Sequence, residues 1–359
     1  MKAVAAFLGK KKPELIDVES LGVPNGLQVK CRTVELGICG TDRDIIGSGN
    51  PWVPTGSEFL VLGHECLAQV EQVGEQVRDF KSGDWVVPLV RRADTPGENR
   101  PDYLPPGQYK ERGIFGAHGF ACGYFLDDEQ YLLKVPHSIL DLAVLTEPVS
   151  ITEKAVREAA CLAMARERTE DYRPRVLVTG QGPIAVAGVL SARSRGWECV
   201  VVGRDDPTTP RAELMTSLGA TYQKWNDWKL DHHDYNPDAE ERGFDLILEC
   251  TGSDQAMLQI APWLRALGVM VWVGAPWEPA PRSLVLGALM RDAILRNQIF
   301  LGTVNSAEQD FRSAFRALSW LKERGISISR VITERVTLEE SLPFYSERPP
   351  QSIKTVVTF

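Results

Sequence analysis

The sequence predicts an α/β protein of two domains, the first rich in β-strands and the second built on a doubly wound parallel sheet. With 359 residues, the chain is too long for one hydrophobic core of the usual size. Before about residue 150, short β-type runs alternate with turns rich in Gly, Pro and Asp. Beyond that point, near-continuous apolar strands alternate with helical patterns, which indicates parallel strands covered on both faces.

The strands expected in the first part are short and bounded by polar turns. The clearest are L-Q-V-K-C-R-T-V-E-L, C-L-A-Q-V-E-Q-V-G, D-W-V-V-P-L-V and Y-L-L-K-V-P. Residues 91–113 are dense in Pro, Gly and charged residues, so we expect a loop there. The first part should therefore be a β domain with few helices.

A helical pattern marks the change between the two parts. It runs T-E-K-A-V-R-E-A-A-C-L-A-M-A-R-E from Thr152, acidic early and basic late, as the helix dipole prefers. The strands predicted after it are R-V-L-V-T, E-C-V-V-V-G, F-D-L-I-L-E-C, V-M-V-W-V-G and Q-I-F-L-G-T-V. Further helices are expected from Pro183, over 211–218 and over 306–323, and the tail S-I-K-T-V-V-T-F closes the chain.

The composition argues against several partners. The net charge is −8 with no Lys/Arg-rich run, so neither a nucleic acid nor an anionic membrane surface is an expected partner. The N-terminal apolar run is too short for a signal peptide, and the longest uncharged stretch, 176–192, is too polar to span a membrane. Seven widely spaced cysteines predict free thiols and a reducing, cytoplasmic location.

A glycine-rich turn predicts a dinucleotide site. Residues 180–188 read G-Q-G-P-I-A-V-A-G, after a predicted strand and at the opening of a predicted helix. Gly180 permits the tight turn, Gly182 lets the backbone approach a pyrophosphate, and Ala185 holds the third small position. A plain structural turn is the alternative reading. The residues predicted to bind the cofactor here are Gly180, Gly182, Pro183 and Ile184.

The end of the next strand bears on which cofactor binds. It reads V-V-V-G-R-D-D, with Gly203 where an NAD-binding protein would carry the acid that receives the ribose hydroxyls. The adjacent Arg204 suits a 2′-phosphate, because a guanidinium binds phosphate oxygens in a bidentate way. The next two residues, Asp205 and Asp206, are acidic and argue against a phosphate at this position. We predict a preference for NADP, with NAD as the alternative.

A cysteine between two glycines points to a metal. Cys39 lies in G-I-C-G-T-D-R-D, a flexible polar turn unlike the apolar runs in which cysteines pack. His64 and Glu65 follow in V-L-G-H-E-C, and Glu147 follows in T-E-P-V-S-I-T-E-K. Thiolate, imidazole and carboxylate are zinc ligands, and a catalytic zinc keeps one coordination position open. Singly, these residues could be a turn cysteine, a core histidine and a helix-capping glutamate; together we interpret them as one zinc site.

With these motifs assembled, the chain resembles the zinc-dependent medium-chain alcohol dehydrogenases, and within them the glucose (aldose) dehydrogenase branch. G-I-C-G-T-D, G-H-E, E-P and G-x-G-P-I match the superfamily, while E-K-A, G-T-V-N-S and S-I-K-T-V-V match the branch. The resemblance covers essentially the whole chain. It implies a GroES-like catalytic domain over 1–152, a Rossmann domain over 153–307, a segment over 308–359 that returns to the catalytic domain, and a homodimer or homotetramer.

The resemblance also implies which residues bind zinc, and the chain departs from many relatives in one respect. Many relatives carry a second, structural zinc on closely spaced cysteines, but residues 90–121 contain none, so we expect one catalytic zinc per chain. Cys39, His64 and Glu147 are the first-choice ligands, with Glu65 as an alternative or exchanging ligand. Cys66 is expected to pack inward.

The implied mechanism assigns roles to further residues. Zinc acts as a Lewis acid on the substrate hydroxyl, and the hydride passes from that carbon to the nicotinamide. Thr41 would begin a proton relay; capping of the helix begun by D-R-D is the alternative. The residues implied to contact the sugar are Thr41, Glu111, Glu147, Glu153 and Asn305. The remaining implied cofactor contacts are Thr251, Gly274, Thr303, Asn305 and Lys354, of which Lys354 reaches either the cofactor or the sugar.

The predicted reaction is oxidation of an aldose, most specifically the C1 hydroxyl of glucose to gluconolactone. The nearest alternative is the same chemistry on a polyol, a cyclitol or an amino-alcohol, as in sorbitol or threonine dehydrogenases. A zinc-free quinone-type reductase is disfavoured, because such relatives lack the Cys/His/Glu set. A different class of protein, a catalytically inactive cofactor-binding structural protein, is the remaining alternative.

Overall fold

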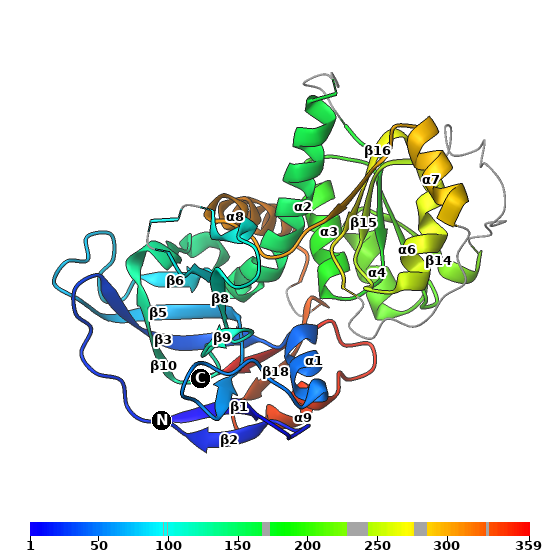
Figure 1. Ribbon diagram of the computed structural model, residues 1–359. Helices are drawn as coiled ribbons and strands as arrows, with labels where there is room; N and C mark the ends of the chain where they lie inside the picture. The colour runs from blue at the N-terminus through cyan, green and yellow to red at the C-terminus, as the bar shows by residue number, and fades with distance from the viewer. Residues whose placement is uncertain (96, 99, 167–172, 228–242, 276–285, 328–329) are drawn as a thin grey trace. The chain divides into compact units, whose positions relative to one another are not determined.

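The computed structural model describes residues 1–95, 97–98, 100–166, 173–227, 243–275, 286–327 and 330–359 (Figure 1). The chain divides into two compact units, here called unit 1 and unit 2. Unit 1 comprises Met1–Glu147, Asn305–Ser319 and Ser327–Phe359, and unit 2 comprises Pro148–Val304 and Trp320–Ile326. The mixed α/β class predicted from the sequence is confirmed.

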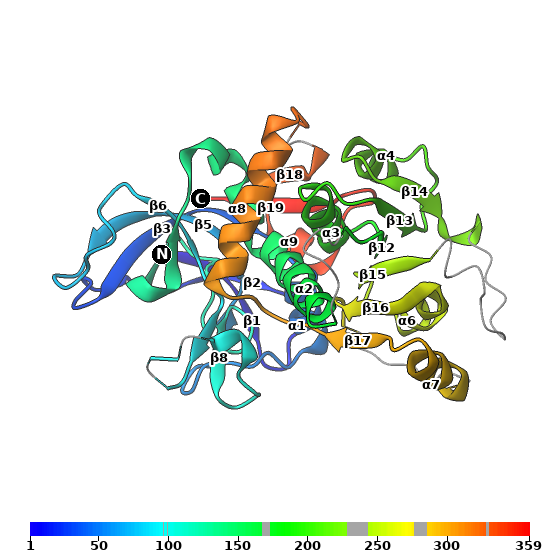
Figure 2. The ribbon, with the colours of Figure 1, turned by 90° about the horizontal axis from the view of Figure 1, so that it is seen from above.

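Unit 1 is built on a seven-stranded sheet. Its strands are β3 (Gln28–Gly37), β5 (Glu65–Val73), β6 (Trp85–Pro88), β10 (Tyr124–Asp128), β11 (Leu132–Lys134), β18 (Ile332–Thr337) and β19 (Lys354–Thr358). Their order is β11-β6-β5-β3-β19-β18, with β10 also paired to β3. Strand β19 runs antiparallel to β3 and parallel to β18, so the C-terminal strands complete a sheet begun near the N-terminus (Figure 2).

Two three-stranded sheets complete the β structure of unit 1. They are β2 (Glu14–Asp17), β1 (Lys2–Phe7) and β4 (Phe59–Val61), and β7 (Arg91–Ala93), β8 (Tyr109–Arg112) and β9 (Gly116–Ala117). The loop predicted over 91–113 is wrong at its two ends, where β7 and β8 form, whereas the described residues between them form turns and the short 3-10 helix Pro101–Tyr103. Arg91 lies opposite Glu111 in the β7–β8 register and both are buried, so the charges of this segment pair internally and do not mark a solvent loop.

The helices of the chain are mostly short. They are α1 (Gly40–Ser48), α2 (Thr146–Met164), α3 (Pro183–Arg193), α4 (Pro210–Ser217), α6 (Asp254–Ile260), α7 (Leu286–Leu295), α8 (Glu308–Glu323) and α9 (Leu342–Ser346), with 3-10 helices η1 (Pro101–Tyr103), η2 (Glu129–Tyr131), η3 (His137–Leu145), η4 (Trp225–Asp227) and η5 (Ala261–Trp263). Helix α2 begins before the predicted Thr152, because Pro148 is tolerated in a first turn that lacks intrahelical N–H bonds. None of the described helices combines the length and apolar character that a bilayer span needs.

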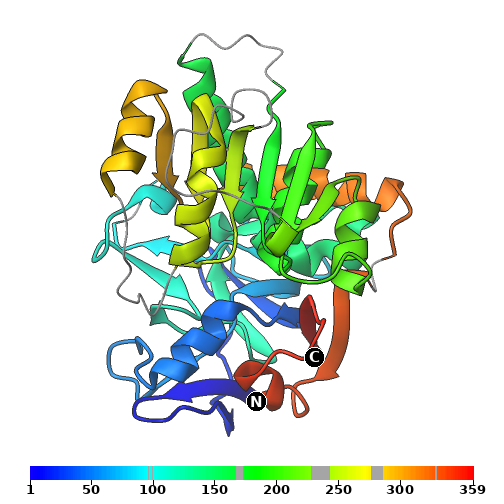
Figure 3. The same ribbon diagram turned by 90° about the vertical axis from the view of Figure 1, so that its right-hand side faces the viewer.

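Unit 2 is built on a six-stranded parallel sheet. Its strands are β12 (Val176–Thr179), β13 (Cys199–Gly203), β14 (Thr221–Lys224), β15 (Phe244–Glu249), β16 (Leu264–Trp272) and β17 (Ile299–Gly302), in the order β14-β13-β12-β15-β16-β17. The order reverses between β12 and β15, and helices α3 and α6 lie on opposite faces (Figures 1 and 3). Only β14 is absent from the sequence prediction, since an edge strand reading T-Y-Q-K has no apolar run.

Candidate functional site

Three predicted metal ligands meet at one point of unit 1. A ligand atom of each of Cys39, His64 and Glu65 lies within 4.8 Å of the others, and no further group of this kind occurs among the described residues. The sheet register explains the meeting. Gly37, at the end of β3, lies opposite Glu65, at the start of β5, so the turn after one strand faces the turn before the other.

Asp42 ties these two turns together. Its Oδ2 accepts a hydrogen bond from the Cys39 amide at 2.8 Å, and its Oδ1 accepts one from the Gly63 amide at 3.4 Å and lies 3.6 Å from His64 Nδ1. The cap of α1 is therefore Cys39 with Asp42, and Thr41 is not the capping residue. Thr41 Oγ1 instead accepts a hydrogen bond from the Cys39 thiol at 3.7 Å. The sequence analysis missed Asp42, although an acid three residues after the cap is a capping-box signal.

The charge distribution of this group favours a cation. Burial alone lowers the pKa of His64, but Asp42, Cys39 and Glu147 outweigh burial and raise that pKa well above its ordinary value. Burial raises the pKa of Glu147 to about 7, and the neighbouring Glu65 also raises it. His64 Nδ1 is buried without a hydrogen bond among the described residues. A crowded set of thiol, imidazole and carboxylate groups with an unbonded ring nitrogen fits zinc.

Lys354 lies beside the predicted metal ligands and forms a buried ion pair with Glu65. Its Nζ donates to Glu65 Oε1 at 2.7 Å and Oε2 at 2.6 Å, and to the Ile38 carbonyl at 3.3 Å. Both side chains are almost fully buried. A buried ammonium needs a buried carboxylate, and Glu65 supplies it. The predicted contact of Lys354 with the cofactor or the sugar stays a prediction.

Glu111 and Asn305, predicted separately as sugar-binding residues, form one buried group. Asn305 Nδ2 donates to Glu111 Oε1 at 3.0 Å, and Arg91 donates to the same oxygen from Nε at 3.0 Å and Nη2 at 2.9 Å. Asn305 has a φ of 58°, a backbone conformation that favours Asn among non-glycine residues. The group belongs wholly to unit 1. Arg91 was missed because nothing in the sequence relates it to Glu111.

Glu153 is committed to a structural ion pair in unit 2. Arg195 donates to Glu153 Oε1 at 2.9 Å and to Oε2 at 2.6 Å. Glu153 is 1% exposed, so it has no face left for a ligand. Both oxygens of Glu153 already accept from a guanidinium, so the predicted contact with a sugar hydroxyl would compete with this ion pair and stays a prediction.

The predicted cofactor residues gather at the carboxyl ends of the unit 2 strands. Gly180 follows β12 with a φ of 96°, and Gly182 is the N-cap of α3. A Cβ at Gly180 would lie 3.1 Å from Thr251 Cγ2, and the Gly274 amide donates to the Glu249 carbonyl at 3.0 Å. The remaining predicted residues at this edge are Pro183, Ile184 and Thr303. This edge, where the strand order reverses, is where open parallel sheets bind ligands.

The end of β13 is linked to the glycine-rich turn. Gly203 is buried and Arg204 is exposed, and Gln181 Oε1 accepts from the amides of Arg204 at 2.9 Å and Asp205 at 3.1 Å. The Arg211 guanidinium lies 2.6 Å from the Asp205 carboxylate, so that acid is neutralised.

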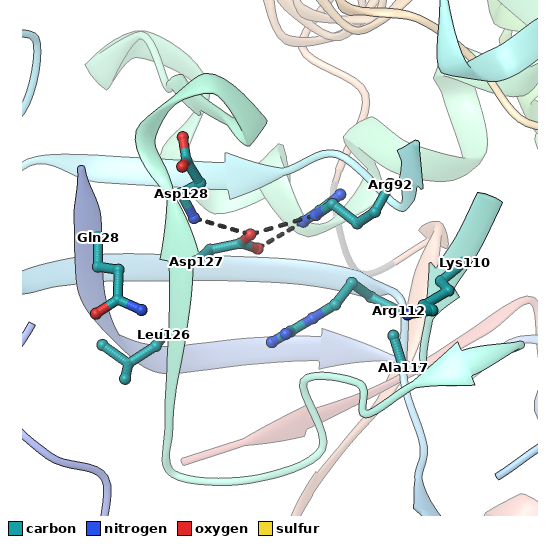
Figure 4. Close-up of a pocket in the computed structure, with 8 residues that line it drawn as sticks. All are labelled: Gln28, Arg92, Lys110, Arg112, Ala117, Leu126, Asp127 and Asp128. Carbon is teal, nitrogen blue, oxygen red and sulfur yellow. Dashed lines mark hydrogen bonds and ion pairs between the residues drawn. The ribbon is translucent and has the colours of Figure 1, made fainter. Parts of the chain in front are cut away.

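A separate polar cavity in unit 1 contains none of the predicted ligands. Its volume is about 290 Å³, and it is lined by Gln28, Arg92, Lys110, Arg112, Ala117, Leu126, Asp127 and Asp128 (Figure 4). Arg92 Nη2 pairs with Asp127 at 2.5 Å, while the Arg112 guanidinium lies 4.8 Å from the Phe120 ring. The Arg92–Asp127 pair therefore links β7 to β10, and the Arg112 side chain, on β8, stacks on Phe120.

Two family models match the chain. Residues 25–137 match the alcohol dehydrogenase GroES-like domain, and residues 140–359 match the glucose dehydrogenase C-terminus.

Similar proteins of known name agree with these matches. The chain is 39% identical to "Glucose 1-dehydrogenase 1" of Caldivirga maquilingensis, covering 93% of this chain and 92% of the relative. It is 35% identical to "Glucose 1-dehydrogenase 2" of Vulcanisaeta moutnovskia, covering 99% of both.

The solved structures agree in fold. A glucose dehydrogenase from Haloferax mediterranei in complex with NADP, Zn and gluconolactone superposes with a TM-score of 0.84 and 30% identity, covering 100% of this chain and 99% of the other. Galactitol-1-phosphate dehydrogenase from Escherichia coli, at 18% identity and a TM-score of 0.81, covers 100% of both chains and shares the fold.

Proposed function

The chain belongs to the zinc-dependent medium-chain alcohol dehydrogenases, in their glucose dehydrogenase branch, and we propose that it oxidises the C1 hydroxyl of glucose to gluconolactone with NADP and zinc. The observation that carries this proposal is the meeting of Cys39, His64 and Glu65 at the position that the sequence motifs assign to a catalytic metal. The similarity to a Haloferax mediterranei enzyme in complex with NADP, Zn and gluconolactone supports the substrate and the cofactor.

Cys39, His64 and one carboxylate would hold the zinc. Glu147 is our first choice for the carboxylate, because both oxygens of Glu65 already accept from Lys354. When bound, zinc supplies Lewis acidity that lowers the pKa of the substrate hydroxyl. Asp42 holds the Cys39 turn through the amide and faces the His64 ring, which keeps both ligands in place without the metal.

The remaining polar side chains handle the proton and the sugar. The Thr41 hydroxyl lies beside Cys39 and can accept and pass on the proton that leaves the substrate. Glu111 and Asn305 would bind sugar hydroxyls, with Arg91 holding Glu111 in position through two hydrogen bonds. A site of several buried polar groups rejects analogues that lack a hydroxyl, because its own groups would be left unpaired.

NADP would lie along the carboxyl edge of the unit 2 sheet. The backbone at Gly182, the N-cap of α3, suits the pyrophosphate. The other predicted cofactor residues at the same edge are Gly180, Pro183, Ile184, Thr251, Gly274 and Thr303. When bound, NADP supplies the acceptor for the hydride from C1. Arg204, exposed at the end of β13, would bind the 2′-phosphate.

A substrate panel tests the proposed function. Glucose and its epimers, sorbitol, threonine and ethanol are assayed side by side with NADP and with NAD. We expect glucose or a close epimer with NADP to give the highest kcat/KM. A preference for a polyol or a simple alcohol would refute the sugar assignment, and a fully zinc-loaded protein without any turnover would favour a structural protein.

We also propose a homodimer or homotetramer in a reducing, cytoplasmic compartment. Helix α7 exposes four large apolar side chains, Leu286, Met290, Ile294 and Leu295, and β17 is an edge strand. All seven cysteines are free thiols. Light scattering that gives a monomer mass would contradict the oligomer.

A further inference from the structure

Gln181 connects two turns that the sequence separates. It lies between Gly180 and Gly182, and its side chain reaches the end of β13. There its Oε1 accepts hydrogen bonds from two successive amides, those of Arg204 at 2.9 Å and Asp205 at 3.1 Å. The side chain is 7% exposed. One carboxamide oxygen therefore fixes the turn that presents Arg204.

The same side chain fills the space above Gly203. A Cβ at Gly203 would lie within 2.5 Å of Gln181 Cγ and Oε1, a distance that real Cβ atoms do not reach. Position 203 ends the second strand of the sheet, where an NAD-binding protein carries its ribose-binding acid. The Gln181 side chain occupies the volume that any side chain at position 203 would need, and glycine is compatible with this because it has no Cβ. Together the two residues exclude an acidic side chain at this position.

The amide nitrogen of Gln181 is left without a partner. Its Nε2 is buried and makes no hydrogen bond within the part of the chain that the structure describes. The orientation of the carboxamide follows from its surroundings, because both neighbouring backbone groups are donors and the oxygen must face them. The two N–H groups of the carboxamide therefore point away from the turn. Because a buried donor without a partner costs free energy, a ligand that supplies an acceptor there would be favoured.

We infer that Gln181 is a specificity-determining residue whose amide nitrogen donates to the 2′-phosphate of NADP, while its oxygen positions the Arg204 turn. The inference rests on the proposed function for the identity of the cofactor. Arg204 is exposed and Asp205 is held by Arg211, so a phosphate here meets one guanidinium and one amide without an unpaired carboxylate. NAD, with a hydroxyl in place of the phosphate, would engage these donors only weakly.

The isosteric variant Gln181→Glu tests the contact. One carboxylate oxygen still accepts from the two amides, while the other replaces the donor by a negative charge that repels a phosphate. NADPH and NADH are titrated by fluorescence without sugar, so the result does not depend on the substrate assignment. We expect the Kd for NADPH to rise by about tenfold or more, and the Kd for NADH to change by less than about twofold.

Gln223→Glu is the matched control, the same change at an exposed position of the neighbouring β14. It should leave both Kd values unchanged. An equal loss for NADPH and NADH in Gln181→Glu, an unchanged NADPH Kd, or the same loss in Gln223→Glu would each overturn the assignment.

A second pair of variants tests the space-filling role. Gly203→Asp alone should lower the Tm and gain no affinity for NADH, because the new Cβ meets Gln181. Combining it with Gln181→Gly should tighten NADH binding, because the acid at position 203 then has room. If Gly203→Asp alone binds NADH as tightly as the double variant, Gln181 does not exclude the acid. A failed sugar assay with normal NADPH binding would count against the proposed function and leave this inference standing.

Discussion

Asp42 is a buried carboxylate that caps helix α1 and also faces His64, a proposed metal ligand. It accepts from the Cys39 amide at 2.8 Å and lies 3.6 Å from His64 Nδ1. Its burial raises its pKa, an effect that His64 opposes. The carboxylate therefore depends on the imidazole for charge compensation, and the imidazole depends on the carboxylate for its orientation.

The variant Asp42→Asn separates the capping of α1 from the electrostatic contact with His64. The amide oxygen can still accept from the Cys39 amide, so the free energy of unfolding should fall by only about 1 kcal/mol. The charge that faces His64 is lost, so zinc affinity should fall by about 10- to 100-fold. Chelator competition measures the affinity and urea unfolding the stability. Asp44→Asn, on the exposed face of α1, is the control, and equal zinc loss in both variants would contradict the role of Asp42.

Arg204 is the exposed residue that we propose to bind the 2′-phosphate of NADP. Arg204→Ala should weaken NADP binding by about 1.5–3 kcal/mol, the value of a lost charge-assisted contact, and should change NAD binding little. Arg312→Ala is the control: it removes the same charge from an exposed ion pair on α8, away from the proposed phosphate site. Calorimetric titration with both cofactors measures the difference. Equal losses for NADP and NAD would show that Arg204 does not bind the phosphate.

At the scale of an element, the first turns of α2 combine two functions. Glu147 lies in the first turn, and Glu153, two turns later, pairs with Arg195. The sequence predicts a ligand role for both, because Glu147 is the glutamate of the E-P motif and Glu153 lies shortly after it. The structure distinguishes them by partner: Glu147 faces His64, Glu65 and Lys354, while Glu153 faces a guanidinium.

Glu153→Gln should therefore be a stability variant. The Arg195 side chain is 30% exposed, so part of its charge returns to water, and the loss should be about 1–3 kcal/mol in the free energy of unfolding. The KM for the sugar should not change. Glu198→Gln, at an exposed pair with Arg175, should cost under about 1 kcal/mol. A large rise in the sugar KM for Glu153→Gln would restore the original prediction.

Sequence reasoning works best where the signal is local. Apolar runs identify β3, β5, β12, β13, β15 and β16, and fixed motifs identify Cys39 and His64. Sequence reasoning fails at the two ends of 91–113, where a loop is predicted and strands β7 and β8 form. It fails there because Arg91 pairs with Glu111 across the two strands. It likewise misses Gln181, whose partners at 204 and 205 come from another turn. Residue type and spacing reveal motifs, but not which distant polar group a side chain will meet.

At the scale of the whole molecule, metal content follows from where the cysteines lie. Of the seven, Cys31, Cys66, Cys122 and Cys199 are buried among apolar residues, and burial raises the pKa of the Cys122 thiol to about 11. Such thiols remain protonated and are poor ligands. Cys66 packs inward as predicted. Cys39, in contrast, lies beside His64 and a carboxylate.

We therefore expect one zinc per chain, held at Cys39, His64 and a carboxylate. Elemental analysis of dialysed protein should give this ratio, and Cys39→Ala should lose both the zinc and the turnover. The circular dichroism spectrum should persist in that variant, because a catalytic metal contributes less to folding than a structural one. Cys161→Ala, at the exposed cysteine, should retain zinc and activity. Two zincs per chain would require a second ligand set, and full activity in zinc-free protein would remove the metal from the reaction altogether.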